Sequence, residues 1–190
     1  MDELLKRLIA CRSCGLCQSR TQVVSGFGDS NAKIILIGEA PGGEEDKLGR
    51  PFVGKAGHQL DRFLEATAIP REQLYITNIV KCRPTAVGKR GLVNRKPSQS
   101  EIASCVHWLE QEIVLLKPRL IVTLGAVPLA HFVGSNPRVS DYHGRILSGI
   151  RENILLFPLY HPAAVIYDRG LKDVYHQDLN VLRETVGSLF

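Results

Sequence analysis

The chain has 190 residues, of which 44% are hydrophobic and 23% are charged, and its formal net charge at pH 7 is +5. These values are ordinary for a soluble globular protein with a buried core, and the modest positive charge is compatible with a polyanionic partner without requiring one. No apolar run approaches the ~20 residues of a membrane span, and residues 1–14 lack the hydrophobic stretch of a signal peptide, so we expect neither a membrane protein nor a secreted one. We expect one domain over residues 1–190, monomeric, cytoplasmic and not bound to a membrane.

An amphipathic helix is expected at residues 2–10, and it runs into the first three of five cysteines. The five are Cys11, Cys14, Cys17, Cys82 and Cys105. In a cytosolic chain they favour metal or redox chemistry over disulfides. Two local and two distant thiolates suit either zinc or an iron–sulfur cluster, and their spacing does not choose between the two. Cys17 is an alternative local ligand, and five buried free cysteines are the structural alternative.

The stretch from Ile34 to Phe52 joins a buried strand, expected at residues 33–37, to a turn rich in glycine and proline. Its apolar run leads into GEAPGG, three acidic residues and GRPF. Ligands of open α/β sheets lie at the carboxyl ends of the strands. We therefore expect Glu39 at the mouth of a pocket, with Phe52 able to fold over it. The alternative is a surface turn whose acidic side chains are only solvated.

The rest of the chain alternates strands with helices. Further strands are expected at residues 74–80, 120–124, 146–147 and 154–157, and helices at 55–67, 99–116, 125–132 and 172–186. Ser98 and Glu101 form a capping box at the start of the second of these helices, and a basic loop with six Lys or Arg residues precedes it at Lys81–Pro97. This alternation predicts an α/β fold with four core strands in a mainly parallel sheet and helices on both faces. The four carboxyl ends carry Glu39, Asn78, Gly125 and His161.

Together these motifs resemble the family 4 uracil-DNA glycosylases, which carry an iron–sulfur cluster. The matching segments, from Cys11 to the last helix, are CRSC, GEAPGGEED, GRPFVGKAG, TNIVKCRP, the Cys105 helix, LGA and HPAA. Each is weak alone, but their order and spacing are highly specific. The resemblance implies a three-layer α/β/α sandwich around a four-stranded parallel sheet. It also implies an enzyme that flips uracil out of single- or double-stranded DNA and hydrolyses its N-glycosidic bond, leaving an abasic site for base excision repair.

The resemblance also implies two sets of site residues. A 4Fe-4S cluster would be held by Cys11, Cys14, Cys82 and Cys105, with Cys17 as a spare thiol. The uracil pocket would be formed by Glu39, Ala40, Pro41, Phe52, Asn78 and His161.

The chemistry of uracil release gives these pocket residues roles. Phe52 stacks on the base, and the amide of Asn78 donates to uracil O4 while accepting from N3–H. His161 donates to O2 and stabilises the leaving anion. Related families place Asp or Asn at the position of Ala40, so Glu39 becomes the catalytic candidate that positions water or stabilises charge, with Glu45 or Asp46 as stand-ins. The structural alternatives are that Asn78 caps a turn, Phe52 belongs to the core and His161 bonds a backbone carbonyl.

Base flipping also requires contacts to the DNA backbone on both sides of the lesion. Phosphate contacts are expected from Arg50, Lys55, Arg90, Arg169 and Lys172, although each is equally compatible with a solvated surface position. The expected loop AAVIYDRG after His161 is the candidate wedge, with Val165, Ile166 or Tyr167 filling the gap in the base stack.

The basic loop Lys81–Pro97 is longer than is typical of the family. One family branch becomes covalently trapped on uracil-DNA, and it has a KRRIHK-like loop here whose histidine forms the link. Asn94 stands at that position, and Ala40 stands where the trapping branch has glutamine, so we expect ordinary turnover and a DNA-contact role for the loop. The open alternatives are a trapping homologue, a non-catalytic iron–sulfur or zinc DNA-binding module, and an electron-transfer protein.

Overall fold

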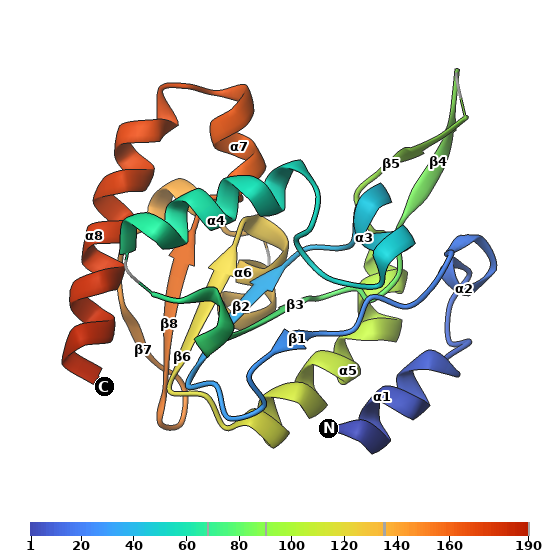
Figure 1. Cartoon of the computed structure of the whole chain (residues 1–190), viewed down its shortest axis with the longest axis horizontal. Coiled ribbons are helices and arrows are strands. Elements are labelled where there is room, and N and C mark those ends of the chain that lie inside the picture. The colour runs from blue at the N-terminus through green and yellow to red at the C-terminus, as the bar shows by residue number, and fades with distance from the viewer. Residues whose placement is uncertain (68, 90, 135, 190) are drawn as a thin grey trace.

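The centre of the computed structural model is a six-stranded sheet with strand order β1-β3-β2-β6-β8-β7 (Figure 1). The structure describes residues 1–67, 69–89, 91–134 and 136–189. The strands are β1 (Phe27–Gly28), β2 (Ile34–Gly38), β3 (Leu74–Asn78), β6 (Leu120–Leu124), β7 (Leu147–Arg151) and β8 (Ile154–Leu159). The four middle strands run parallel, whereas β1 and β7 pair antiparallel at the two edges. The predicted four-stranded parallel core is confirmed, and two antiparallel edge strands extend it.

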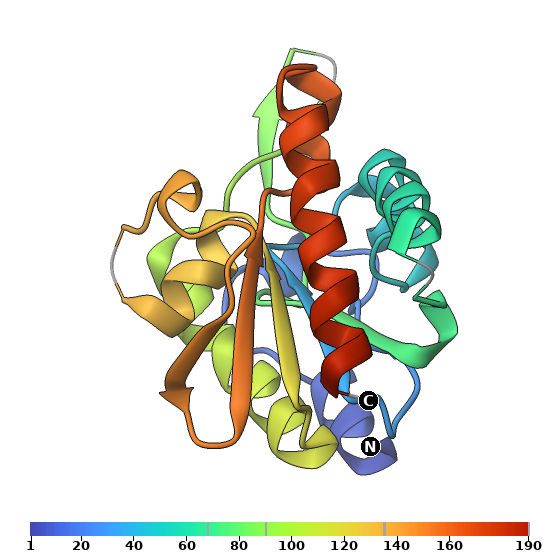
Figure 2. The same ribbon diagram turned by 90° about the vertical axis from the view of Figure 1, so that its left-hand side faces the viewer.

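Helices cover both faces of this sheet and complete the predicted α/β/α sandwich (Figures 1 and 2). One face carries α1 (Asp2–Ile9), α5 (Gln99–Leu116) and α6 (Ala126–Val133), and the other carries α4 (Lys55–Thr67), α7 (Pro162–Tyr167) and α8 (Leu171–Leu189). Because successive strand residues point to opposite faces, Ile35 and Ile37 of β2 join the first hydrophobic cluster while Ile34 and Leu36 join the second. Both faces of β2 are therefore core, which explains its unbroken apolar run.

Local signals set the ends of several elements. The Ser98 hydroxyl accepts a hydrogen bond from the Glu101 amide at 3.2 Å, and the Glu101 carboxylate accepts one from the Ser98 amide at 2.7 Å, so the predicted capping box starts α5. Short turns of helix were not expected at α2 (Leu16–Ser19), α3 (Gly43–Leu48), η1 (Arg71–Gln73) and η2 (Val139–Asp141). Among the described residues, no helix combines the length and apolarity required to cross a bilayer.

Two segments expected to be loops have regular structure. Within Lys81–Pro97, β4 (Thr85–Gly88) and β5 (Gly91–Asn94) form an antiparallel hairpin that projects from the body of the molecule (Figure 1). The expected wedge loop after His161 is instead the helix α7, because Pro162 occupies its first turn and the His161 side chain caps it.

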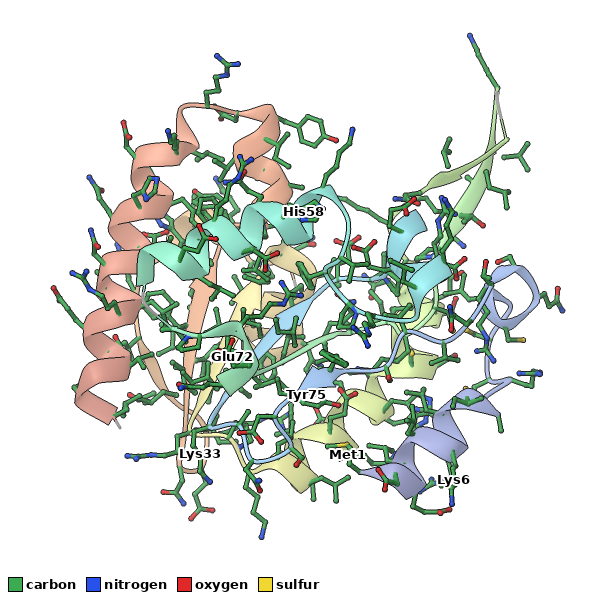
Figure 3. The ribbon with its side chains drawn as sticks, in the orientation of Figure 1. Met1, Lys6, Lys33, His58, Glu72 and Tyr75 are labelled. Atoms are coloured by element: carbon green, nitrogen blue, oxygen red, sulfur yellow. The ribbon has the colours of Figure 1, made fainter. Side chains whose placement is uncertain are left out.

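Lys81 is not part of the basic surface to which its loop was assigned. Its side chain is fully buried, and its ammonium group donates to Thr77 Oγ1 at 2.5 Å, to the Asn78 carbonyl at 2.8 Å and to Glu112 Oε2 at 2.6 Å. The same carboxylate accepts from the Tyr75 hydroxyl at 3.2 Å. The Tyr75 hydroxyl also lies 3.8 Å from the sulfur of Met1 (Figure 3). This network joins β3 to α5 directly beneath the pocket residue Asn78.

Candidate active site

A pocket of about 690 Å³ opens at the carboxyl ends of β2, β3 and β8. Lys33, at the amino-terminal side of β2, marks the opposite end of the sheet (Figure 3). Six lining residues are those expected to form the site: Glu39, Ala40, Pro41, Phe52, Asn78 and His161. They come from four separate parts of the sequence and meet because parallel strands end at the same edge of a sheet.

Phe52 is held as a rigid wall of this pocket. Its backbone has a φ of 54°, in the left-handed region that a phenylalanine rarely adopts, and such a conformation persists only where surrounding contacts enforce it. One contact is the hydrogen bond from Arg71 to the Phe52 carbonyl at 3.0 Å, and another is the close approach of Gly57, where an added Cβ would lie 1.9 Å from that carbonyl oxygen. The Phe52 ring lies 5.9 Å from the His161 ring, centroid to centroid. The pocket thus has a fixed aromatic face.

Asn78 presents a buried amide to the pocket. The residue is 3% exposed, and among the described residues no hydrogen bond engages its side chain. Its position depends on Gly38, where an added Cβ would lie 2.4 Å from Asn78 Oδ1 and 2.6 Å from the Phe52 ring. A buried amide is costly when unsatisfied, so its donor and acceptor are free for a ligand that matches both.

His161 has a defined tautomer. Its Nδ1 accepts a hydrogen bond from the Ala163 amide at 3.1 Å, which leaves the proton of the neutral ring on Nε2. Burial lowers the pKa of His161 below its usual 6.5, and the nearby Glu45 carboxylate offsets only part of this effect. At neutral pH the pocket therefore contains an uncharged N–H donor at His161 Nε2.

Glu39 is a half-buried carboxylate in the same pocket. Burial raises its pKa above the usual 4.5, while the positive charge of Lys96 acts in the opposite direction. No hydrogen bond to its side chain occurs among the described residues. Glu39 is thus available to accept a proton or a water hydrogen bond.

Glu45 and Asp46, the two alternatives to Glu39 as the catalytic acid, both accept hydrogen bonds from backbone amides. Glu45 lines the pocket, but its carboxylate accepts from the backbone amides of Gly42, Val53 and Gly54 at 3.1, 3.0 and 2.8 Å. Asp46 is 3% exposed, lies outside the pocket lining and accepts from the Thr21 amide at 3.0 Å. Their carboxylates fold the loop around the pocket, so Glu39 is the acid with a free side chain.

The residues expected to contact phosphate are spread over the surface around the pocket. Lys55 is exposed and lines the pocket. Arg50 lies outside the lining, with its guanidinium 4.6 Å from the centre of the Phe27 ring, and Arg169 is exposed after α7. Arg90 lies outside the described residues. Geometry therefore places only Lys55 of this group in direct contact with the pocket.

The wedge candidates divide by burial. Val165 is 8% exposed and packs in the core, so it cannot insert between bases. Ile166 and Tyr167 are 44% and 88% exposed, and both line the pocket rim. Helical geometry explains the division, because neighbouring residues of α7 point in different directions.

Three pocket residues from the base of the hairpin were not assigned to the site from sequence. These are Arg83, Asn94 and Arg95. The TNIVKCRP motif, which contains Arg83 five residues after Asn78, was the available signal.

The four cysteines expected as ligands gather between α1, α5 and the end of β3. Cys82 and Cys105 are buried, and Cys11 and Cys14 pack against the same hydrophobic cluster. Burial raises the pKa of Cys82, and it raises that of Cys105 to about 11. Cys82 Sγ accepts from Arg20 at 3.1 Å, and Cys105 Sγ accepts from the Lys81 amide at 3.2 Å. Among the described residues, no three Cys, His, Asp or Glu side chains are arranged around a common point for one metal ion.

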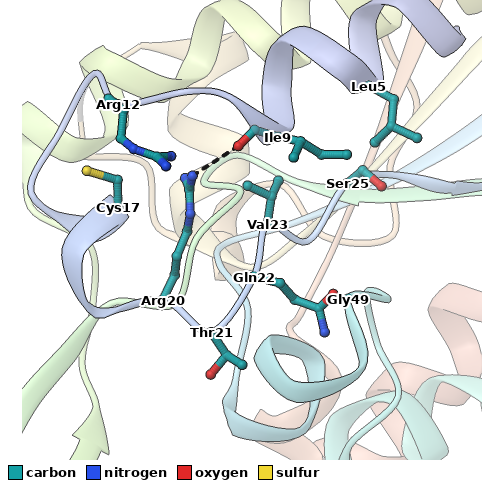
Figure 4. A pocket seen from close by; sticks show the side chains of 10 residues that line it. All are labelled: Leu5, Ile9, Arg12, Cys17, Arg20, Thr21, Gln22, Val23, Ser25 and Gly49. Atoms are coloured by element: carbon teal, nitrogen blue, oxygen red, sulfur yellow. Dashed lines mark hydrogen bonds between the residues drawn. The ribbon is translucent and has the colours of Figure 1, made fainter.

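Cys17 follows Cys14 by one turn, and its backbone amide donates to the Cys14 carbonyl at 3.2 Å. It lines a separate cavity of about 540 Å³ together with Arg12 and Arg20 (Figure 4). The Arg20 guanidinium lines this cavity, donates to the Ile9 carbonyl at 3.2 Å and also donates to Cys82 Sγ (Figure 4).

Residues 25–181 match the sequence profile of the uracil DNA glycosylase superfamily. A type-4 uracil-DNA glycosylase of Sulfurisphaera tokodaii is 37% identical over 191 residues, covering 97% of this chain and 84% of that protein. The type-4 enzyme of Thermotoga maritima is 38% identical over 171 residues, covering 90% of this chain and 85% of that protein. The type-4 enzyme of Archaeoglobus fulgidus is 34% identical, covering 98% of this chain and 94% of that protein. The chain belongs to the uracil-DNA glycosylase superfamily.

Proposed function

We propose that this protein is a monofunctional uracil-DNA glycosylase that acts on single- or double-stranded DNA as a monomer with a single domain. The observation that carries the proposal is the joint placement of a fixed aromatic wall, an unpartnered amide and a neutral N–H donor in one pocket.

Base selection follows from the amide of Asn78. Its N–H donates to uracil O4 and its carbonyl accepts from uracil N3–H, while Phe52 stacks on the ring. Cytosine presents the reverse pattern at these two positions and would leave both groups unmatched. Each buried mismatch costs ~1–3 kcal/mol, so this single side chain provides much of the discrimination.

Bond cleavage requires charge stabilisation at both ends of the breaking bond. As the bond between uracil N1 and sugar C1′ breaks, its electron pair moves to the uracil ring, and His161 Nε2–H donates to O2 of the departing anion. Glu39 orients a water molecule toward C1′, and its carboxylate accepts the proton that this water loses when its oxygen bonds to C1′. The products are free uracil, protonated from solvent, and an abasic site.

The rim of the pocket is suited to hold the flipped nucleotide outside the base stack. Ile166 and Tyr167 fill the space that the base leaves, as apolar wedges do in other DNA-bending proteins. Lys55 contacts a nearby phosphate, and Arg50, Arg90 and Arg169 add contacts farther along the strand. Such contacts position the DNA without reading its sequence.

A 4Fe-4S cluster held by Cys11, Cys14, Cys82 and Cys105 is the second part of the proposal. The donor set fits, because thiolates are the ligands of such clusters and the four cysteine sulfurs of a multi-iron cluster lie farther apart than the ligands of one ion. Trp108 supports the fit, because its buried Nε1–H lacks a hydrogen-bond partner among the described residues and the residue lies in the same hydrophobic cluster as Cys82 and Cys105. When bound, the cluster ties α1 and the base of the hairpin to the core.

The proposal is tested by incubating the protein with a uracil-containing oligonucleotide, treating the product with alkali and separating it on a denaturing gel. Strand cleavage at the uracil position is expected. A protein-sized shift that survives denaturation would indicate covalent trapping instead, which the amide of Asn94 disfavours. If neither a cleaved product nor a shift is observed, the protein is a non-catalytic DNA-binding module.

A further inference from the structure

Arg83 is a half-buried cation that lines the pocket and has no carboxylate partner among the described residues. It follows Cys82 at the base of the β4–β5 hairpin. Among the described residues, its side chain makes one hydrogen bond, from Nε to Asn94 Oδ1 at 2.7 Å. The two terminal nitrogens of the guanidinium therefore remain free to donate to a ligand.

Two contacts fix the direction in which this guanidinium points. The hydrogen bond that Arg83 Nε donates to Asn94, at the end of β5, holds one edge of the group. The other contact is with the backbone at Gly43, where an added Cβ would lie 3.4 Å from both Cζ and Nη2 of Arg83. A Cβ added at Gly42 would lie 3.4 Å from Nδ2 of Asn94, so Gly42 lies beside this amide nitrogen. The pair therefore lies over a turn without side chains at the pocket mouth.

Among the described arginines that line the pocket, Arg83 is the one whose terminal nitrogens are unused. Arg95 also lines the pocket, but its terminal nitrogens bind both oxygens of Glu101 at 2.8 and 2.6 Å. Among the acids, Glu44 pairs with Lys47 at 3.0 Å and Glu45 accepts from backbone amides. A preoriented arginine fork with an adjacent amide N–H matches the oxygens of a phosphate group.

We propose that Arg83 and Asn94 form a binding site for one phosphodiester adjacent to the flipped uridine, with the terminal nitrogens of Arg83 and Nδ2 of Asn94 as donors. The site rests on the proposed glycosylase function and adds a contact that none of the predicted DNA-binding residues supplies. It places the hairpin base against the reacting nucleotide itself. The hairpin thus contributes to positioning the uracil as well as to general DNA affinity.

The test combines Arg83→Gln with single neutral methylphosphonate linkages in the oligonucleotide. The linkages are placed on the 5′ side of the uridine, on its 3′ side, or four nucleotides away. For the unaltered protein, one adjacent linkage should lower kcat/KM by about 10- to 100-fold, the range of a charge-assisted hydrogen bond. Arg83→Gln should lower kcat/KM on normal DNA by a similar factor and should lose sensitivity to that same linkage.

Three further variants separate a phosphate site from general charge or structural effects. Lys89→Gln removes an exposed hairpin charge and should reduce kcat/KM by one common factor for every oligonucleotide. Asn94→Asp should resemble Arg83→Gln, because the new carboxylate would occupy the guanidinium. Arg83→Lys keeps the positive charge but loses the two terminal nitrogens of the guanidinium. Its kcat/KM should be reduced by the adjacent methylphosphonate by a factor between those of the unaltered protein and Arg83→Gln. This variant also tests the site if Arg83→Gln fails to fold.

The two proposals fail in different ways. If the unaltered protein releases no uracil from normal DNA, the proposed function is wrong. If it releases uracil but each methylphosphonate lowers kcat/KM by the same factor in Arg83→Gln as in the unaltered protein, the proposed phosphate site is wrong and the glycosylase function stands.

Discussion

Burial shifts the pKa values of Glu39 and His161, two of the ionisable side chains that line the pocket, in opposite directions. It raises the pKa of Glu39 and lowers that of His161, so both are driven toward their neutral forms. For His161 the neutral form is the useful one, because its Nε2–H can donate without first losing the Ala163 hydrogen bond. For Glu39 the useful form is the ionised one. Because burial raises its pKa, Glu39 loses this charge at a higher pH than a solvated glutamate does.

Glu39 should therefore control the acidic side of the pH–rate profile. The value of kcat/KM should fall as pH decreases through the pKa of Glu39, which lies above 4.5, because the carboxylate takes up the proton that it must accept from water. Glu39→Gln should be slower at neutral pH and should lack this decline. Single-turnover rates between pH 4.5 and 8 measure both. An unchanged acidic limb in Glu39→Gln would contradict the assignment.

His161→Ala should lower kcat on uracil-DNA by a factor equivalent to ~3–4 kcal/mol, the usual loss when one donor to a developing oxyanion is removed. KM should change much less, because the bond strengthens mainly in the transition state. His161→Gln retains an N–H donor and should recover part of the rate. Equal losses in both variants would show that His161 acts only as the cap of α7.

The lowered pKa of His161 also affects stability. Below its ordinary pKa of about 6.5, the unfolded chain binds a proton that the folded chain does not, so folding free energy is lost as pH falls from 6.5 toward the lowered value. Above 6.5 this contribution is fully present. The His161→Ala variant should show a smaller loss of stability over that interval.

At the scale of elements, two glycines in helices should respond in opposite ways to the same substitution. In α4, Gly57→Ala would place Cβ 1.9 Å from the Phe52 carbonyl oxygen, so the backbone that holds the aromatic wall must move. We expect a loss of ~1–3 kcal/mol and lower kcat/KM. In α8, Gly187 has nothing within 4 Å of an added Cβ, so Gly187→Ala should gain up to ~1 kcal/mol with unchanged kcat/KM. Denaturant unfolding and uracil release measure the contrast.

The junction between β3 and α5 depends on the buried pair Lys81–Glu112, whose side chains are 0% and 2% exposed. Lys81→Met leaves an unpaired buried carboxylate and should cost ~3–5 kcal/mol of unfolding free energy. Adding Glu112→Gln should restore much of this loss, since an amide oxygen still accepts from Tyr75.

The surface pair Lys47–Glu44 provides the matched comparison, because its side chains are 66% and 59% exposed. Lys47→Met should change the unfolding free energy by less than ~1 kcal/mol. Similar costs for Lys47→Met and Lys81→Met would contradict a special role for the buried pair.

Sequence patterns predicted the elements whose signals are local. The helix at 99–116 has a capping box and a following proline, and its bounds are confirmed, as are those of the strand at 120–124. The meeting of Glu39, Asn78 and His161 followed from strand polarity alone. The sequence also held a signal for the hairpin, because Gly88 and Gly91 stand close together between two short runs that contain apolar residues.

Features that depend on distant partners escaped prediction. Lys81 appeared to belong to a basic surface because Glu112, its counter-charge, is 31 residues away in the sequence. The short strand β1 has little pattern of its own and exists through pairing of Phe27 with Ile76. Val165 was a plausible wedge until helix α7 turned it toward the core. In each case tertiary packing decided what local composition left open.

At the scale of the whole molecule, cysteine substitutions should distinguish the proposed ligands of the iron–sulfur cluster from Cys17, which is not expected to bind it. Cys105→Ser should abolish the visible absorbance of an iron–sulfur cluster and lower the unfolding midpoint, because α1 and the hairpin base lose their common attachment. Cys17→Ser should leave both unchanged, since Cys17 lines a different cavity. Absorbance spectra and thermal unfolding of the purified holoprotein provide the readout. Loss of the cluster in Cys17→Ser would reassign the ligand set.

The length of the hairpin can be changed without altering the pocket. Its strands pair antiparallel from Thr85 with Asn94 to Gly88 with Gly91, so paired residues can be removed together. Deleting Ala86 and Val87 together with Leu92 and Val93 would preserve the register and strand faces of the remaining pairs while shortening the projection by ~3.4 Å per residue removed from a strand. The chemistry at the strand ends would remain in place. Protein engineers can therefore treat the length of the hairpin as a design variable that is separate from the chemistry of the pocket.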